Sequence, residues 1–228
     1  MSPPPAAAAD DGGPPLPGAR EDFTLRPIRR QEVPVWYHAY CTAQHPTRAD
    51  SFNEGWGRTR FAPLRQADGT PVHTWYAAST VEGALMESLL HDVPLAPPGL
   101  FEHAALAHWH LATVQLPDPF TAVSLHTKDL PRLGGGQGRG LTRAQLIDSL
   151  PPHYPATRAW AQAAFDQCPA AQGIAWTARR DDAARCVMLF GQRLPAPPFT
   201  VLADEPLALG ARRAEVLALV RSLRLHEV

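Results

Sequence analysis

The chain has 228 residues, which is enough for one large domain or two small ones. Apolar residues make up 45% of it and the formal net charge is -1, so bulk electrostatics give no reason to expect a nucleic acid or a membrane as partner. No apolar run approaches the roughly 20 residues that a membrane-spanning helix needs. The three cysteines lie far apart, and this sparse, odd-numbered set favours a reducing, cytoplasmic environment over a disulfide framework.

Residues 1–20 are dominated by Pro, Ala, Gly and Asp, and they lack the basic start and long apolar stretch of a secretory signal. They cannot bury enough apolar surface to offset the entropy lost on ordering, so we expect a disordered tail. The remaining residues, 21–228, are expected to form one compact domain.

Short apolar stretches, several of them with alternating polarity, predict strands along this domain. They cover residues 32–40, 74–78, 107–116, 120–125, 173–176, 186–190 and 200–202. Helices are predicted at residues 81–91 behind a capping box of Ser79 and Glu82, after the cap residue Thr142, from Pro155 or Ala156 to Cys168, and at residues 211–223. The Gly-rich stretch 133–140 is expected to be a mobile loop. Because strands and helices do not alternate regularly, the pattern favours an α+β fold of short mixed strands with flanking helices.

The chain is organised around residues 57–92, which bring an arginine, a tyrosine and a glutamate together. Arg60 lies in a Gly-containing loop, Tyr76 in a short strand, and Glu87 on the predicted helix. The helical spacing puts Glu87 at the margin of the inward face, where a carboxylate can face a cleft. A guanidinium, a phenol and a carboxylate in one place suit an anionic ligand that carries ribose.

Three blocks of sequence carry a family resemblance. They are residues 57–63 (GRTRFAP), residues 76–80 with 83–87 (YAAST, GALME), and residues 173–179 with 187–190 (GIAWTAR, VMLF). These blocks are similar to the Arg-Phe loop, the Tyr-Ala-Ala block with its Ala-Leu-x-Glu helix, and the serine segment of the RES-domain family. That family is named for an Arg, a Glu and a Ser, and includes NAD-degrading toxins of bacterial toxin–antitoxin pairs.

The resemblance implies a compact fold similar to ADP-ribosyltransferase toxins, with NAD as substrate in a cleft and an antitoxin protein as partner. It implies cleavage of the nicotinamide–ribose bond, with inorganic phosphate or water as acceptor. No metal is expected, because no Asp or Cys lies at ligand spacing from His103, His108 and His110. Carried over to this sequence, the catalytic residues are Glu87 and Arg60. The NAD-binding residues are Arg60, Tyr76, Arg58, Thr177 and Ala178.

Each of these residue types suits a step of this chemistry. Breaking an N-glycosidic bond passes through an oxocarbenium-like state, which the Glu87 carboxylate can stabilise near the ribose. Guanidinium matches a diphosphate by paired hydrogen bonds, which suits Arg60, and such a site could also hold an attacking phosphate. Arg58 competes for this role, but Phe61 follows Arg60 as in the family pattern. The Tyr76 phenol can stack on the nicotinamide ring.

The sequence departs from the family at one position. Ala178 stands where the third block would carry the serine, and the hydroxyl of neighbouring Thr177 would face the opposite way on a strand. Two alternatives therefore stay open beside the NAD-cleaving enzyme. One is an ADP-ribosyltransferase that modifies a protein, and the other is an NAD-binding module with weakened catalysis. A homodimer stays open as well.

Overall fold

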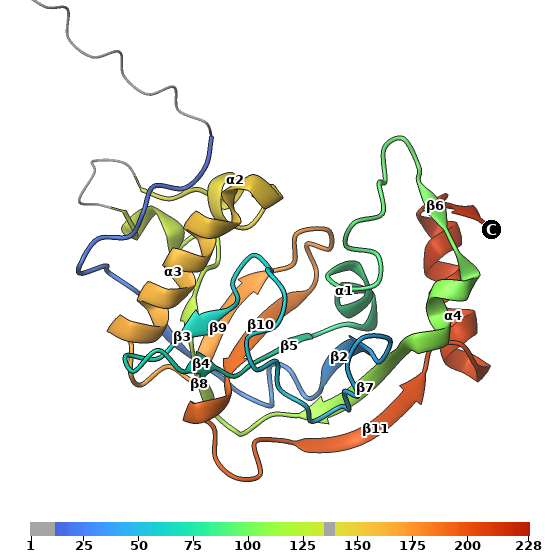
Figure 1. Ribbon diagram of the computed structural model, residues 1–228, viewed down its shortest axis with the longest axis horizontal. Coiled ribbons are helices and arrows are strands. Elements are labelled where there is room, and N and C mark those ends of the chain that lie inside the picture. Colours follow the sequence, from blue (N-terminus) through green and yellow to red (C-terminus); the bar gives the residue numbers. More distant parts are fainter. Residues whose placement is uncertain (1–11, 135–139) are drawn as a thin grey trace, which may run out of the picture.

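The computed structural model describes residues 12–134 and 140–228, and its central feature is a curved eight-stranded sheet (Figure 1). In order across the sheet, the strands are β1 (Leu25–Ile28), β8 (Phe120–Ser124), β9 (Gly173–Thr177), β10 (Arg185–Phe190), β5 (Thr74–Ala78), β2 (Trp36–Cys41), β7 (Trp109–Gln115) and β11 (Thr200–Pro206). Neighbouring strands run antiparallel, except for β8 and β9, which are parallel.

The helices and two small sheets lie around this large sheet. The helices are α1 (Val81–Met86), α2 (Arg143–Leu146), α3 (Tyr154–Gln167) and α4 (Gly210–Ser222), with 3-10 turns at His103–His108, Leu130–Arg132, Pro151–His153 and Gly191–Arg193. The small sheets pair β3 (Leu64–Arg65) with β4 (Pro71–Val72) and β6 (Leu100–Phe101) with β12 (His226–Glu227). This mixture confirms the predicted α+β class. Within the described part of the chain, no helix is long and apolar enough to cross a membrane.

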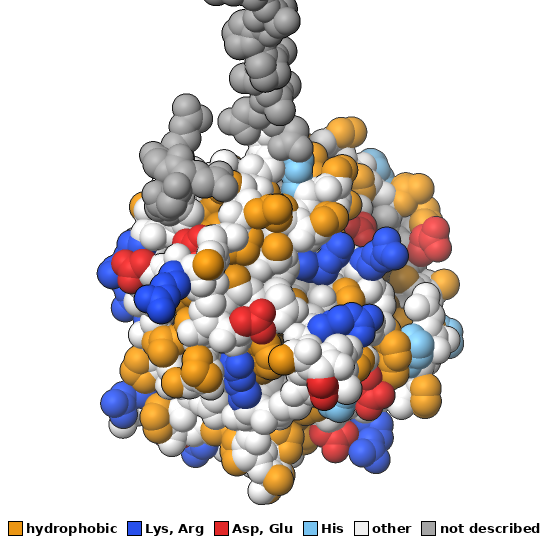
Figure 2. Space-filling view, turned by 60° about the vertical axis from the view of Figure 1, so that its left-hand side comes forward, with side chains coloured by type: hydrophobic (Ala, Val, Ile, Leu, Met, Phe, Trp, Pro, Cys, Tyr) orange, Lys and Arg blue, Asp and Glu red, His pale blue; other side chains and the backbone are white. Residues whose placement is uncertain are grey.

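The sheet carries a hydrophobic core on each face, because successive side chains of a strand point to opposite sides. Strand β10 shows the alternation: Met188 packs in the larger core with Trp160 of α3 and Leu85 of α1, whereas Val187 packs in the smaller core with Trp36. In Figure 1 the helices α1, α2 and α3 lie on one side of the sheet, and β11 runs along its far edge. On the face shown in Figure 2, basic and acidic side chains are interspersed with apolar ones rather than gathered by sign.

The sheet is weakest between β2 and β5. Their ladder contains one register pair, Tyr37 with Ala78, whereas β2 pairs with β7 over its whole length. Part of the gap is bridged by a side chain, since His38 Nδ1 lies 2.6 Å from the Tyr76 carbonyl oxygen. The two strands therefore stay joined near the start of α1 and diverge away from it, toward Thr74 and Cys41.

Most predicted elements are present, but several begin or end elsewhere for local reasons. The strand predicted at 32–40 begins only at Trp36, because the N–H groups of Glu32 and Val33 close a turn onto the Arg29 carbonyl. The strand predicted at 107–116 begins at Trp109, after a 3-10 turn. The strand predicted at 200–202 extends to Pro206 because it pairs with β7.

The helix predicted at 81–91 is shorter and is capped by a different residue. Helix α1 ends at Met86, and residues 87–92 continue as turns. The cap is Thr80, whose side chain accepts a hydrogen bond from the Gly83 N–H. The predicted cap, Ser79, instead accepts a hydrogen bond from the Arg185 N–H, so its hydroxyl belongs to the sheet.

The predicted N-terminal tail and Gly-rich loop fall partly outside the described residues, namely at 1–11 and 135–139. Residues 12–20 are described, and some of them contact α3. Pro14 is buried, the Pro15 carbonyl accepts a 2.6 Å hydrogen bond from Trp160 Nε1, and the Gly18 carbonyl accepts one from Gln167. Docking onto the helix supplies the apolar contact that the segment lacks by itself.

Gly173 allows β9 and β10 to approach closely. A Cβ atom added there would collide with the backbone carbonyl oxygen of Met188, which cannot move without breaking the ladder. We expect Gly173→Ala to lower the free energy of unfolding by about 1–3 kcal/mol in urea titrations. The control is Gly18→Ala, which meets only a flexible glutamate side chain and should change it by less than about 0.5 kcal/mol. Equal stability of the two variants would contradict this account.

Candidate active site

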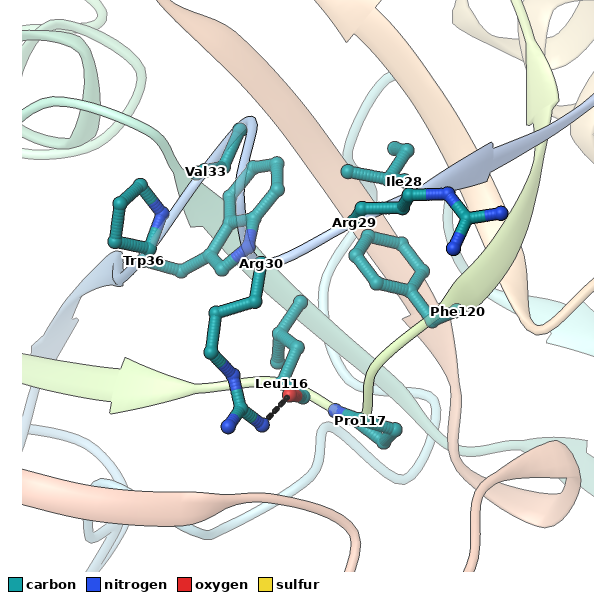
Figure 3. A pocket seen from close by; sticks show the side chains of 9 residues that line it. Ile28, Arg29, Arg30, Val33, Trp36, Leu116, Pro117 and Phe120 are labelled. Atoms are coloured by element: carbon teal, nitrogen blue, oxygen red, sulfur yellow. Dashed lines mark hydrogen bonds between the residues drawn. The ribbon is translucent and has the colours of Figure 1, made fainter.

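A cleft of about 1010 Å³ lies where β2 and β5 diverge. Its lining comes from β2, from β5, from the loop before Phe61, from α1 and from the start of α3. A second pocket, shown in Figure 3, has a volume of about 10 Å³ and is closed in by Ile28, Trp36 and Phe120. That volume is about the size of one water molecule, so it is a packing gap. The large cleft is the candidate site.

The floor of the cleft is a row of residues that face each other across four strands. Trp176 of β9 pairs with Cys186 of β10, Cys186 with Ala78 of β5, and Ala78 with Tyr37 of β2. All four line the cleft, as does Tyr76 from the next row on the same face. Burial raises the pKa of the Cys186 thiol well above its ordinary value, so this residue stays protonated and does not act as a nucleophile.

Arg60 enters the cleft from a loop that α3 holds in place. The Arg60 carbonyl accepts a hydrogen bond from the buried hydroxyl of Thr157, and the Thr59 carbonyl accepts one from Arg158. The Arg60 side chain is only 6% exposed, and its guanidinium lies near the rings of Tyr154 and Phe61. A buried guanidinium needs compensation for its lost hydration.

That compensation comes from Glu87, the residue that caps the C-terminus of α1. Its Oε2 lies 3.7 Å from Arg60 Nη1, and its Oε1 accepts a short hydrogen bond from the Arg179 N–H. The Glu87 side chain is 15% exposed, so it is shielded but still reaches the cleft. The structure thus brings the two predicted catalytic residues together.

One edge of the Arg60 guanidinium does not contact Glu87. Nη1 faces Glu87, whereas Nε and Nη2 are buried and have no hydrogen-bond partner among the described residues. These two nitrogens lie on the same edge of the planar group, so their N–H bonds run in parallel. This is the edge that binds the paired oxygens of a phosphate or a carboxylate.

Tyr76 lies on the same floor with its hydroxyl tied to the Arg60 loop. Its Oη is 3.0 Å from Thr59 Oγ1, and its ring meets the Trp176 ring edge-on at 6.4 Å. Burial raises the pKa of the Tyr76 phenol above its ordinary value, so the hydroxyl keeps its proton. Arg58 is exposed and also lines the cleft.

Thr177 and Ala178 do not line the cleft. The Thr177 hydroxyl lies 3.1 Å from His126 Nδ1, on the other side of β9. Ala178 is fully buried and its carbonyl accepts a hydrogen bond from Arg143. The third sequence block therefore contributes to the site through Trp176 and through the backbone N–H of Arg179.

The turn that follows β9 holds α1 at both ends. Arg180 donates hydrogen bonds to the carbonyls of Leu90 and Val93, beyond the C-terminus of the helix. Asp181 accepts a 3.2 Å hydrogen bond from the Thr80 hydroxyl at the N-terminus. The Arg179 N–H donates to the Glu87 carboxylate itself, so three successive residues of this turn hold the carboxylate and the helix that carries it. Sequence reasoning missed this role, because a charged turn between two strands is typical of a solvated loop.

Sequence reasoning also missed Tyr154, Trp176 and His38, which all line the cleft. Tyr154 begins a helix and the other two belong to apolar strand patterns, so their local sequence gives no sign that they line a cleft. His38 donates through Nδ1 to the Tyr76 carbonyl, and burial lowers its pKa to about 4. It is therefore neutral at pH 7.

Among residues 12–134 and 140–228, no group of three or more His, Cys, Asp and Glu side chains is placed to hold a metal ion.

Comparisons with known proteins identify the family and the fold. The model of the RES domain matches residues 34–209, most of the chain. The chain belongs to the RES-domain family. Among solved structures it is similar to a chain of the M. tuberculosis MbcT–MbcA toxin–antitoxin complex, with a TM-score of 0.53 at 15% identity over 89% of this chain and 91% of that one. At that identity the likeness establishes a shared fold. No curated protein sequence matches the chain.

Removing the clamp on α1 should weaken this RES domain. We expect Arg180→Ala to lower the free energy of unfolding by about 1–3 kcal/mol, because two carbonyls lose hydrogen bonds from a charged donor. Urea titration measures the change. Arg179→Ala is the matched control, since Glu87 contacts the backbone of Arg179 and the substitution keeps that N–H. A larger loss in the control than in Arg180→Ala would contradict the clamp.

His38 should make stability depend on pH. Between about pH 6.5 and 4 the unfolded chain binds a proton at His38 and the folded chain does not, so stability falls as the pH falls through this window. The expected loss is on the order of 2–3 kcal/mol. Urea titrations at pH 7.5 and 4.5 should show a smaller loss for His38→Asn than for the unmodified protein. His226→Asn, at an exposed histidine, should behave like the unmodified protein.

Proposed function

We propose that this RES-domain protein is an enzyme that cleaves the nicotinamide–ribose bond of NAD, with phosphate or water as the acceptor. The observation that carries the proposal is the Glu87–Arg60 pair in the large cleft, in which Nε and Nη2 of Arg60 have no hydrogen-bond partner among the described residues. A fixed carboxylate beside an unpaired guanidinium edge matches a substrate that joins a ribose to a diphosphate.

In the proposed reaction, Glu87 lies against the ribose and stabilises positive charge as the glycosidic bond breaks. The bonding electrons pass to the pyridinium nitrogen, and nicotinamide leaves as a neutral molecule without needing a proton. Attack by water then gives ADP-ribose and a proton, whereas attack by phosphate gives the ADP-ribose phosphate ester. Because Arg179 and Arg60 hold Glu87 from two sides, the carboxylate needs little reorganisation during the step.

The other cleft residues would bind the substrate. Arg60 would take the diphosphate through Nε and Nη2, while Tyr76, on the cleft floor, would position the nicotinamide ring. Arg58 would add positive charge at the rim. Thr177 and Ala178 are left out of this set, because neither lines the cleft.

We further infer that the protein acts as the toxin of a toxin–antitoxin pair in the cytoplasm, where an antitoxin protein would cover the cleft. The fold shared with a chain of a toxin–antitoxin complex supports this inference. The free thiols of all three cysteines fit a reducing compartment.

One observation keeps a second candidate function in view. The position of the family serine is occupied by Ala178, which is buried and has no hydroxyl. If that hydroxyl is needed for turnover, the protein would bind NAD without cleaving it. An ADP-ribosyltransferase using the same cleft is distinguished by where the ADP-ribose goes, because label from NAD would remain on a protein.

NAD consumption by the purified protein, with and without inorganic phosphate, tests the proposal. We expect Glu87→Gln to lower the rate by roughly 10²–10³-fold or more, because the variant keeps the shape of the side chain and loses its charge. The matched control is Glu82→Gln, an exposed glutamate on the same helix, which should leave the rate unchanged.

The products decide between the candidates. Consumption that depends on Glu87 establishes the enzyme, and its dependence on phosphate identifies the acceptor. Label retained on protein would favour the transferase. If calorimetry shows that the unmodified protein binds NAD but does not consume it, the proposed NAD-cleaving activity is wrong and the NAD-binding module is favoured.

A further inference from the structure

Two of the residues that line the cleft, Tyr154 and Trp176, each carry a buried, uncharged hydrogen-bond donor. Tyr154 Oη and Trp176 Nε1 are buried, and neither has a hydrogen-bond partner among the described residues. Both residues line the cleft, and their exposures are 8% and 3%. Buried polar atoms in folded proteins are normally hydrogen-bonded, so unpaired donors on residues that line one cleft point to a ligand.

The Tyr154 ring lies over the Arg60 guanidinium, and the Trp176 ring lies one ring further away, against Phe61. The central carbon of the guanidinium lies 5.7 Å from the centre of the Tyr154 ring and 6.0 Å from that of the Phe61 ring. The Phe61 ring in turn meets the Trp176 ring edge-on at 5.1 Å. With Arg60 Nε and Nη2, three residues that line the cleft therefore carry four buried donor atoms without a hydrogen-bond partner among the described residues.

The backbone around these donors is fixed. The Thr157 hydroxyl lies within hydrogen-bond distance of the carbonyls of both Arg60 and Tyr154, which couples the loop to the first turn of α3. Arg158, also on the first turns of α3, lines the cleft and donates to the Thr59 carbonyl. The positive end of the 14-residue helix α3 thus faces the same space as Arg60.

The number and kind of donors decide which ligand fits. A carboxylate would occupy the paired edge of Arg60 and leave Tyr154 and Trp176 unsatisfied. A diphosphate offers several oxygen acceptors on two linked groups, so it can satisfy the paired edge and both neutral donors at once. Glu87 contacts Nη1, on the opposite side of the guanidinium from Nε and Nη2, so an anion bound at that edge would not lie against the Glu87 carboxylate.

We propose that Tyr154 and Trp176 complete, with Arg60, a binding site for a diphosphate group, to which Tyr154 Oη and Trp176 Nε1 donate hydrogen bonds. This inference rests on the proposed function in that the diphosphate would be the one in NAD. It assigns two further ligand-binding residues, one of which lies outside the three sequence blocks. It also accounts for binding in a chain whose Ala178 has no hydroxyl to offer.

Calorimetric titration with inorganic pyrophosphate tests this site without involving NAD. Tyr154→Phe keeps the ring beside Arg60 and removes only the hydroxyl, so we expect it to weaken pyrophosphate binding about 10-fold or more. Trp176→Phe should weaken binding to a similar degree, and Arg60→Lys should weaken it further because lysine lacks the paired edge. Trp109→Phe is the matched control for Trp176→Phe, since it removes an indole N–H from a residue that does not line the cleft and should bind like the unmodified protein.

The outcomes separate this inference from the proposed function. Thermal unfolding of each variant first shows that the fold is kept. Pyrophosphate binding that is equal in Tyr154→Phe and in the unmodified protein would overturn the site, even if NAD is consumed. Binding that depends on Tyr154 and Arg60 would support the site, even if NAD is not consumed and the proposed reaction fails. No pyrophosphate binding by the unmodified protein would also overturn it.

Discussion

The site depends on one buried ion pair, Glu87 with Arg60, and on how each partner is restrained. Burying the guanidinium is costly unless an opposite charge lies near, and Glu87 supplies that charge from the end of a short helix. The carboxylate is in turn held by a backbone N–H from the turn after β9. If both side chains could move, the Glu87 carboxylate would form a paired contact with Nε and Nη2 of Arg60. The loop, the helix and the turn restrain the two side chains, so Glu87 contacts Nη1 instead.

The cleft exists because the sheet is incomplete between β2 and β5. A single register pair joins these strands, and His38 bridges them through its ring in place of a further backbone hydrogen bond. Burial keeps that ring neutral, which removes a positive charge from the centre of the cleft. The opening gives a ligand access to Tyr76 and to the row of residues across β9 and β10. A fully paired sheet would have closed this space with backbone.

Local sequence signals predicted much of the fold and several of the residues that line the cleft. Strands such as β5 and β10 are runs of buried apolar residues, and α3 has helical spacing behind a proline, so each follows from short-range patterns. Arg60, Tyr76 and Glu87 were found because they lie within one short stretch that resembles a known family. Tyr154 was not, because a tyrosine at the start of an apolar helix has the same local pattern whether it serves packing or binding.

The sequence by itself determined the composition of a globular α+β chain, the family to which it belongs and the residue types of the proposed chemistry. Only the tertiary structure decided which groups face the cleft. Thr177 and Ala178 are excluded because strand alternation and the packing of α1 turn them away, whereas the next backbone N–H supports Glu87. Whether a donor such as Tyr154 Oη finds a hydrogen-bond partner is likewise decided by the tertiary structure, because the residues that surround it are distant in the chain. The physical reason is the same in each case: side-chain direction and burial are set by long-range packing.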